Sequence, residues 1–324
     1  LIMHSSDQMG NACTEGGAIV KTTCVPLGLS EEQAWEIKVL TEVEDLYDGR
    51  YRMRYRSKNS GAYQVEVTIN GEPVNGSPCT MKLVSSTPLL QKSSLDGPGL
   101  KVAVAGERAP FSIRFVDQFG NLANPAGTAF KMGMAVTSEL HKKVQDVKET
   151  AFEGVWSAEG TYQIHYIAQV AGNLELHVWC DLNGKGERMA FPGSPFSVSV
   201  SAGTPSASAS RVDGWTLEKR ASTDKNNNLN KKKSSGEDDA GKIIAGDTVG
   251  VRPLIVDSFQ NPASKINVDT LTAKVVRPNG SEVVLAVQQE VRQMKGSGSE
   301  MVYGVRYETS LSGKHAMHVM LGGV

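Results

Sequence analysis

One short pattern occurs three times in this chain of 324 residues and limits its fold more than any other feature. It reads Tyr-x-apolar-x-Tyr, with a glycine six residues after the second tyrosine, and its copies span Tyr51–Gly61, Tyr162–Gly172 and Tyr303–Gly313. Alternating apolar residues that end at a glycine are typical of a strand with one buried face, followed by a turn. We therefore expect strands that recur in successive units.

A second pattern lies at a matched distance before each tyrosine pattern. It begins with aspartate and ends with asparagine, at Asp7–Asn11, Asp117–Asn121 and Asp257–Asn261. The aspartate precedes the first tyrosine by 44, 45 and 46 residues, and successive aspartates are 110 and 140 residues apart. A period of this size predicts separate domains in a row rather than a solenoid built from much shorter units.

The longer second period has a visible cause in the third unit. The segment KRASTDKNNNLNKKKSSGEDDAGK at Lys219–Lys242 is polar and accounts for an insertion of 23 residues. It carries too few apolar side chains to offset the entropy lost on ordering, so we expect a flexible loop. Its run of Lys231, Lys232 and Lys233 is a candidate contact for an acidic partner, although a solvated tether is the simpler interpretation.

Most of the sequence between these landmarks alternates as β-strands do. Phe111, Ile113 and Phe115 are separated by single residues, and the pairs Asn70-Gly71, Asn183-Gly184 and Asn279-Gly280 are typical of hairpin turns. Many short strands in units of about 110 residues predict an all-β fold of tandem β-sandwiches. One segment disagrees, because Ser30-Glu31-Glu32-Gln33 before Ala34-Trp35 looks like the start of a helix. The matching part of the other units looks extended, so we predict strand there.

The second unit closely resembles a filamin-type immunoglobulin-like repeat. The motifs that carry the resemblance occur in the family's order, at Leu95–Leu100, Val104–Glu107, Phe111–Asp117, Glu159–Tyr162 and Gly193–Val200. The first unit departs from the pattern with Cys79 in place of phenylalanine, and the third has Gln260 in place of the turn glycine. The resemblance implies tandem immunoglobulin-like β-sandwiches over nearly the whole chain.

The register of the repeats gives the expected domain boundaries. We predict a first repeat at 1–85, a complete second repeat at 86–200 and a third repeat at 201–324 that contains the insertion near 219–242. The first is expected to lack its first strand and the third its last strand. The chain is accordingly interpreted as a fragment of a larger filamin-repeat protein, with short Ser/Pro junctions that couple the repeats loosely.

The charge pattern does not favour nucleic acid. The net charge is −1, so no overall field attracts an acidic polymer. Arg52, Arg54 and Arg56 form a basic row beside aromatic residues, but only the apolar skeleton of this strand recurs in the other units. We interpret the row as a solvated strand face and predict no nucleic-acid partner. No apolar run is long enough for a membrane span.

No catalytic or metal-binding constellation is recognisable. His315 and His318 are three apart on a predicted strand, so they face opposite sides, and His165 and His177 lie on separate strands without acidic or cysteine partners at ligand spacing. Phosphate-loop and nucleophile-elbow motifs are absent from the sequence. We predict a protein that is not an enzyme and needs no cofactor and no metal.

The cysteines and glycosylation sequons bear on the compartment. Cys13, Cys24, Cys79 and Cys180 form no CxxC motif, so free thiols in a reducing compartment are the simpler interpretation, and a Cys13–Cys24 bridge remains open. Sequons begin at Asn75 and Asn279, although Pro78 makes the first a poor acceptor. They keep an extracellular location open as the lesser alternative.

The resemblance implies a structural scaffold and interaction rod that binds other proteins. We expect a cytoskeletal protein of the cytoplasm, cilium or axoneme, with cytoskeletal or axonemal partners; the alternative is a cell-surface adhesion ectodomain. The family's usual docking mode adds a partner strand in the groove between the third and fourth strands. Here the mostly small outward row at that edge is Ala129, Lys131, Gly133 and Ala135, and a glycine in mid-strand often marks close approach by another backbone. The alternative is that these small residues only make room for a neighbouring loop.

Overall fold

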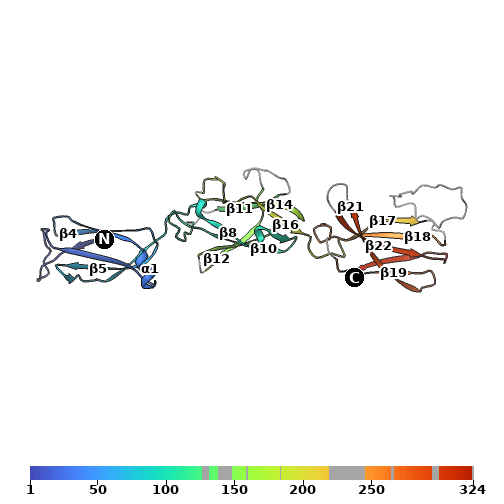
Figure 1. Ribbon diagram of the computed structural model, residues 1–324, viewed down its shortest axis with the longest axis horizontal. Helices are drawn as coiled ribbons and strands as arrows, with labels where there is room; N and C mark the ends of the chain where they lie inside the picture. Colours follow the sequence, from blue (N-terminus) through green and yellow to red (C-terminus); the bar gives the residue numbers. More distant parts are fainter. Residues whose placement is uncertain are drawn as a thin grey trace.

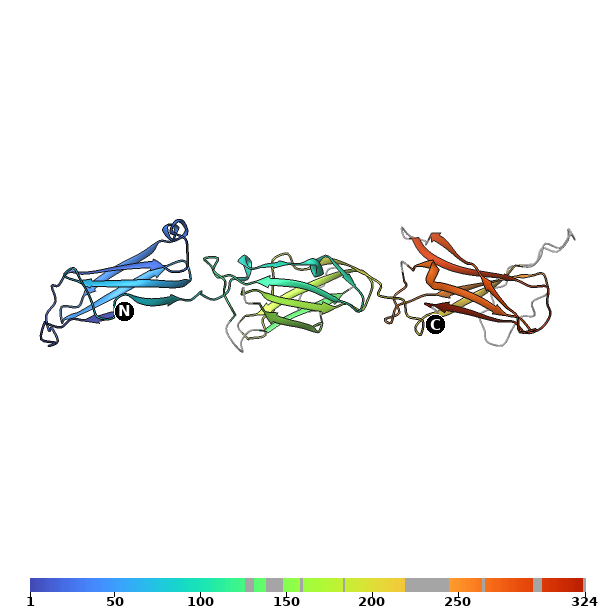
Figure 2. The same ribbon diagram turned by 90° about the horizontal axis from the view of Figure 1, so that it is seen from below.

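The computed structural model describes residues 1–125, 131–137, 148–157, 160–182, 184–218, 245–263, 266–293 and 299–322. These residues are mainly strands, which form three β-sandwiches arranged in a line (Figures 1 and 2). We call them the first sandwich (β1–β7), the second sandwich (β8–β16) and the third sandwich (β17–β23). The predicted all-β fold is confirmed.

The first sandwich packs two small sheets against each other. One sheet has the order β1-β4-β3, from β1 (Ile2–His4), β4 (Arg50–Ser57) and β3 (Val39–Asp45). The other centres on β5 (Gly61–Ile69), which pairs with β2 (Val20–Pro26), β6 (Glu72–Pro73) and β7 (Cys79–Leu83). Met53 from one sheet and Val65 and Val67 from the other form the centre of its core.

One prediction for the first sandwich is wrong. The segment expected to be a strand at Ser30–Trp35 is the short helix α1 (Glu31–Glu36). The Ser30 hydroxyl accepts a hydrogen bond from the Gln33 backbone N–H, and the Gln33 side chain accepts one from the Ser30 N–H. This capping box satisfies two backbone donors at the start of the helix, and no residue of the helix is buried. The capping-box motif therefore indicated the structure of this segment better than the comparison with the other units did.

The second sandwich has the largest core. Its sheets have the orders β12-β13-β10-β8 and β11-β14-β16-β9, with β15 beside β14. The strands are β8 (Ser94–Asp96), β9 (Val102–Val104), β10 (Arg108–Arg114), β11 (Lys131–Thr137), β12 (Phe152–Trp156), β13 (Tyr162–Ile167), β14 (Gly172–Asp181), β15 (Met189–Ala190) and β16 (Phe196–Ser201). Phe111 and Ile113 of β10 meet Leu176 and Val178 of β14 within one buried cluster, as the alternation predicts.

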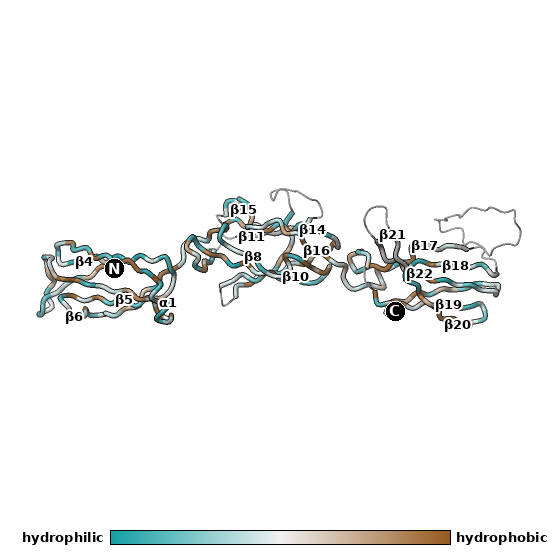
Figure 3. Tube along the Cα trace, in the orientation of Figure 1, coloured by the Kyte–Doolittle hydropathy of each residue, from teal (hydrophilic) through white to brown (hydrophobic). Residues whose placement is uncertain are grey.

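The third sandwich repeats this plan. One sheet has the order β17-β18-β22-β21 and the other β20-β19-β23. The strands are β17 (Arg211–Glu218), β18 (Thr248–Leu254), β19 (Leu271–Val276), β20 (Glu282–Leu285), β21 (Val287–Gln293), β22 (Ser299–Glu308) and β23 (Ala316–Leu321). Apolar and polar residues alternate along the strands of all three sandwiches, as Figure 3 shows by colour. Tyr51, Tyr166 and Tyr303 of the repeated pattern are all buried.

The aspartate–asparagine segments are tight turns with the same backbone path. In each, the fourth residue has a positive φ, which is +86° at Gly10, +92° at Gly120 and +68° at Gln260. The aspartate carboxylate accepts hydrogen bonds from backbone N–H groups within the turn, such as that from Asn121 to Asp117 at 2.9 Å. The third turn therefore holds a residue with a Cβ where the left-handed conformation favours glycine.

The first prediction exchanges these residues. Gln260→Gly should raise the free energy of unfolding of the third sandwich by about 1 kcal/mol, because the backbone strain is removed. Gly120→Gln should lower that of the second sandwich by a similar amount, because a Cβ there meets no atom within 4 Å and only backbone strain is added. Urea unfolding followed by NMR signals of each sandwich measures both. A Gln260→Gly variant of unchanged or lower stability would contradict the interpretation.

The buried aspartates also make stability depend on pH. Burial by itself raises the pKa of Asp117, but hydrogen bonds from the Asn121 side chain and the Ser86 backbone N–H outweigh it and lower the pKa from 3.8 to about 2. A carboxylate whose pKa is lowered on folding stabilises the fold above its unfolded pKa, and this contribution is lost as the pH falls through the folded pKa.

The second prediction follows from this shift. The second sandwich should lose about 2 kcal/mol of stability between pH 4 and pH 2 from this group alone. In Asp117→Asn that part of the decline should be absent, although the variant starts less stable at pH 7. Urea unfolding of both proteins across this pH range measures the difference. Parallel curves for the two proteins would show that Asp117 does not carry the effect.

Candidate functional site

A groove opens between the edges of the two sheets of the second sandwich. Strand β11 ends one sheet and β12 ends the facing sheet. Between them lies a cavity of about 720 Å³, lined by the end of β11, the start of β12 and the end of β13. Residues Gln169 and Val170, which follow β13, continue the lining toward the third sandwich. The groove therefore lies at the place where the resemblance predicts partner binding.

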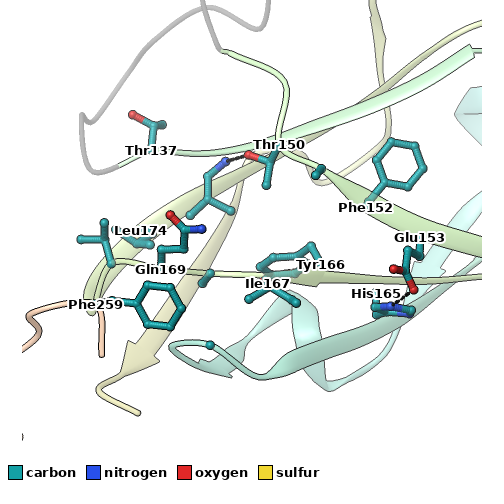
Figure 4. Close-up of a pocket in the computed structure, with 15 residues that line it drawn as sticks. Thr137, Thr150, Phe152, Glu153, His165, Tyr166, Ile167, Gln169, Leu174 and Phe259 are labelled. Atoms are coloured by element: carbon teal, nitrogen blue, oxygen red, sulfur yellow. Dashed lines mark hydrogen bonds and ion pairs between the residues drawn. The ribbon is translucent and has the colours of Figure 1, made fainter. Parts of the chain in front are cut away.

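The two ends of the groove differ in chemistry. At one end the Phe259 ring comes from the third sandwich and lies near Gln169 and Leu174 (Figure 4). At the other end Glu153 Oε2 lies within hydrogen-bond distance of His165 Nε2, at 2.8 Å, across the neighbouring strands β12 and β13. Arg108 lies 3.4 Å from the same carboxylate. An occupant would meet an aromatic wall at one end and charged groups at the other.

Within the described residues, no strand pairs with the outer edge of β11. Among the described strands, β11 pairs only with β14. The Val136 N–H donates to the Thr150 hydroxyl at 3.2 Å, so this N–H points away from β14. Backbone groups of alternate residues in an antiparallel strand point to the same side, so Met134 and Met132 also direct their N–H and C=O groups toward the open edge. Such a row can pair with an added strand.

The structure places some of the predicted row on this strand. Lys131 and Gly133 lie in β11 opposite Asp181 and Trp179 of β14, respectively. Ala135 lies opposite His177 and packs with Trp179, on the face of the sheet turned away from the main core. Ala129 and the Lys231–Lys233 run lie outside the described residues.

The outward face is closed where Ala135 lies. Ala135, His177 and Trp179 are only 1%, 2% and 3% exposed. The Arg188 guanidinium lies 4.8 Å from the centre of the Trp179 ring and 3.2 Å from Glu149. At this end the accessible surface is therefore the strand edge and the adjoining groove rather than the row of small side chains.

Phe259 and the Glu153–His165 pair were not predicted from the sequence. Phe259 is an apolar residue within an otherwise polar turn, and Phe119 and Met9 occupy the same position in the other two turns. This position was an available signal in the sequence. Met9 is 86% exposed, whereas Phe259 is 39% exposed because it lies against the second sandwich. An apolar side chain in an exposed turn is a reasonable indication of contact with a neighbour. The Glu153–His165 contact depends on the β12–β13 register and has no signal in sequence spacing.

The basic row of the first sandwich is paired with acidic residues. Arg52 and Arg54 of β4 lie 3.1 Å from Glu44 on β3, and Arg54 also lies 3.5 Å from Glu42. These cross-strand ion pairs offset the positive charge that a nucleic-acid surface needs.

All four cysteines are free thiols in the structure. Cys24 and Cys79 lie on either side of Val65 in neighbouring strands. Two strand spacings separate them by about 9.5 Å, which exceeds the reach of a disulfide. Burial raises the pKa of the Cys180 thiol to about 12, so the reactive thiolate does not form at neutral pH.

The described residues contain no cluster of three or more metal-ligating side chains. A search of the same residues finds no helix of the length and apolar character that a bilayer crossing requires.

Comparisons with known proteins agree with the fold and with the sequence motifs. The family model described as "Filamin/ABP280 repeat" matches residues 2–80. Filamin-C of Rattus norvegicus is 30% identical over 148 residues, which is 46% of this chain and 4% of that protein. The dynein alpha chain of the flagellar outer arm of Chlamydomonas reinhardtii is 26% identical over 204 residues, or 60% of this chain and 4% of that protein. The chain thus spans a small part of these relatives' length.

A solved structure shares the overall architecture. The Escherichia coli adhesin FdeC superposes with a TM-score of 0.55 at 15% identity, covering 100% of this chain and 87% of that one. At this identity the likeness concerns the fold alone. The filamin family is one of structural and interaction repeats, and the matches to it agree with the three occurrences of the landmark turns and tyrosine strands. These findings support tandem filamin-type immunoglobulin-like repeats: the family model matches the first sandwich, and the second and third sandwiches share its landmark turns and tyrosine strands.

Proposed function

We propose that this chain is a non-catalytic rod segment of a cytoskeletal scaffold, which binds partner proteins by strand addition. The observation that carries the proposal is the open edge of β11 beside a groove of about 720 Å³. The three repeats provide length, and the groove provides a place for an extended peptide. We propose the repeat boundaries 1–85, 86–200 and 201–324 for this rod.

The third repeat supplies internal support for strand addition. Its strand β19 pairs with β23 in the way that β11 pairs with β14. The outer edge of β19 is occupied by the chain's own strand β20, which pairs with it from Ala273 to Val276. In this fold the edge therefore accepts an antiparallel strand, and β11 presents the corresponding edge in the second repeat.

Two observations support the cytoskeletal setting over the adhesion alternative. The relatives found by sequence include a filamin and a flagellar outer-arm dynein chain, whereas the adhesin likeness rests on fold alone. The four free thiols fit a reducing compartment such as the cytoplasm, cilium or axoneme. Cytoskeletal or axonemal proteins are the partners that we propose.

The third prediction distinguishes the two settings. In protein purified from its native source, mass spectrometry should find all four cysteines labelled without reduction and no glycan on Asn75 or Asn279. Both asparagines are exposed, so a secretory route would leave them accessible to glycosylation. Labelling under denaturing conditions with and without reductant controls for the buried Cys180. A disulfide or a glycan would support the adhesion alternative instead.

The fourth prediction tests strand addition at β11. Peptides of 12 residues selected from a random library against the whole chain should include sequences whose binding shifts the NMR signals of Met134 and Val136. Met134→Pro removes an N–H that faces the open edge without breaking a bond to β14. It should lower the affinity for such a peptide about tenfold.

The matched control for this experiment is Met134→Leu, which keeps the N–H and should bind like the original protein. Selected peptides that bind Met134→Pro and Met134→Leu equally, or whose shifts map away from β11 and the groove, would contradict strand addition at this edge.

A further inference from the structure

The first junction between repeats is closed by one asparagine side chain. Asn121, in the turn of the second repeat, donates from Nδ2 to the Lys58 carbonyl of the first repeat at 2.8 Å. Its Oδ1 accepts from the Ser60 backbone N–H at 2.9 Å. Lys58 and Ser60 belong to the turn that leads to Gly61 in the repeated pattern. The amide thus bonds the carbonyl of one residue and the N–H of the second residue after it.

The second junction has the same arrangement at the equivalent residues. Asn261 of the third repeat donates from Nδ2 to the Gln169 carbonyl at 2.8 Å and accepts at Oδ1 from the Ala171 N–H at 2.9 Å. Ala171 precedes Gly172 as Ser60 precedes Gly61. Two junctions of different sequence therefore use the same atoms at nearly the same distances.

The chemistry explains why asparagine serves at this position. A primary amide presents a donor and an acceptor side by side, so it can bond both backbone groups of the turn at once. All four groups that it meets in the preceding repeats belong to the backbone. The recognition consequently does not depend on the side chains of the turn, which differ completely between the two junctions.

The partner aspartate holds the asparagine and the linker together. Asn121 Nδ2 also donates to Asp117 Oδ2 at 2.9 Å, and the Ser86 N–H of the linker donates to the same oxygen at 3.0 Å. Asp257 does the same at the second junction, where it accepts from Asn261 Nδ2 at 2.8 Å and from the Gly203 N–H at 2.9 Å. One carboxylate therefore joins the turn of its own repeat, the linker, and, through the asparagine, the preceding repeat.

We propose that this aspartate–asparagine pair is an orientation clasp, through which each repeat recognises the glycine turn of another filamin-type repeat before it. A linker alone leaves bending and twisting free, because it attaches at one point. The clasp adds a second attachment through two directional bonds, and so fixes both angles. The five-residue aspartate–asparagine turn thereby determines the relative orientation of adjacent repeats.

The second clasp also completes the groove. Asn261 is two residues from Phe259, whose ring lies so close to Gly106 that a Cβ there would be 2.6 Å from the ring atom Cε2. Fixing the third repeat on the second therefore keeps the aromatic wall at the end of the groove. This consequence rests on the proposed function of the groove, whereas the clasp itself does not.

The first repeat provides a matched control. Asn11 makes the same bonds within its turn, from its backbone N–H to Asp7 Oδ1 at 2.8 Å and from Nδ2 to Asp7 Oδ2 at 2.9 Å. In the described part of the chain Asn11 has no hydrogen bond to another repeat. Replacing it with alanine removes the Nδ2 bond within the turn without removing a contact between repeats.

The fifth prediction is measured on the whole chain by NMR residual dipolar couplings, which report the alignment of each repeat. In the original protein the three repeats should share one alignment. In Asn261→Ala the third repeat should reorient independently of the second, because domains without a large interface move relative to each other by default. The alignment that the third repeat shares with the second should therefore fall by about half. Asn121→Ala should uncouple the first repeat in the same way, and Asn11→Ala should leave all three aligned.

If Asn261→Ala disrupts the turn itself, a second pair of variants still tests the contact between the two repeats. Ala171→Pro removes the N–H that Asn261 accepts from, on the other side of the junction, and leaves the aspartate–asparagine turn intact. Its control is Ser312→Pro, the equivalent position before Gly313. Ala171→Pro should uncouple the third repeat and Ser312→Pro should not.

Three results would contradict the orientation clasp. These are separate alignments of the repeats in the original protein, a common alignment that survives both Asn261→Ala and Ala171→Pro, or equal uncoupling by Asn11→Ala. Failure of the library peptides to bind would contradict the proposed function and leave the alignment result standing, so the two failures are distinguishable.

Discussion

The buried carboxylate of the landmark turn is the interaction on which the arrangement of this chain depends. Asp117 and Asp257 are each 1% exposed, and a buried charge is tolerated only when hydrogen bonds replace its water. The donors come from the turn and from the linker, and the asparagine that caps the carboxylate also reaches the neighbouring repeat. A single satisfied charge thus connects the local fold of each repeat to the geometry of the rod.

This polar connection is needed because the sandwiches bury their apolar surface separately. The main core cluster of each sandwich draws its residues from that sandwich alone, from both of its sheets. The apolar contact that we identify across the second junction is Phe259 against Gly106 and its surroundings. Directional hydrogen bonds suit such a junction, because they can fix the angle between two domains without a shared apolar core.

The sequence predicted the features that follow from local chemistry and from repetition. Alternating apolar residues such as Phe111 and Ile113 specify which strand face is buried, and Asn70-Gly71 adopts the positive φ angles of a hairpin turn. The capping box of helix α1 is also a local signal. The prediction of a strand there was wrong because it relied on the extended appearance of the matching segments in the other units. Asn121 and Asn261 were recognised as landmarks, but their contacts to the preceding repeat required the three-dimensional placement of two domains.

The candidate site shows the same division between local and non-local information. The part of the predicted row that the structure describes, Lys131, Gly133 and Ala135, lies on β11 (Lys131–Thr137). The outward direction of Ala135 follows from alternation. The sequence could not show that Trp179 and Arg188 close that face, because their contact joins strand β14 to a loop beyond it. It also could not show that an edge is open, since openness depends on every strand that does or does not pair there.

The contrast between β11 and β19 sets a physical condition on partner binding. An exposed strand edge invites indiscriminate pairing, and proteins usually protect it. In the third repeat the chain's own β20 covers the edge, which removes it from competition. At β11 the Thr150 hydroxyl occupies the Val136 N–H, and the groove beside it is bounded by Phe259 and by the Glu153–His165 pair. A partner strand must therefore displace a side-chain hydrogen bond and fit between an aromatic wall and a charged end. Selectivity at this edge would come from those three side-chain features, while the backbone ladder would supply affinity to any extended peptide that satisfies them.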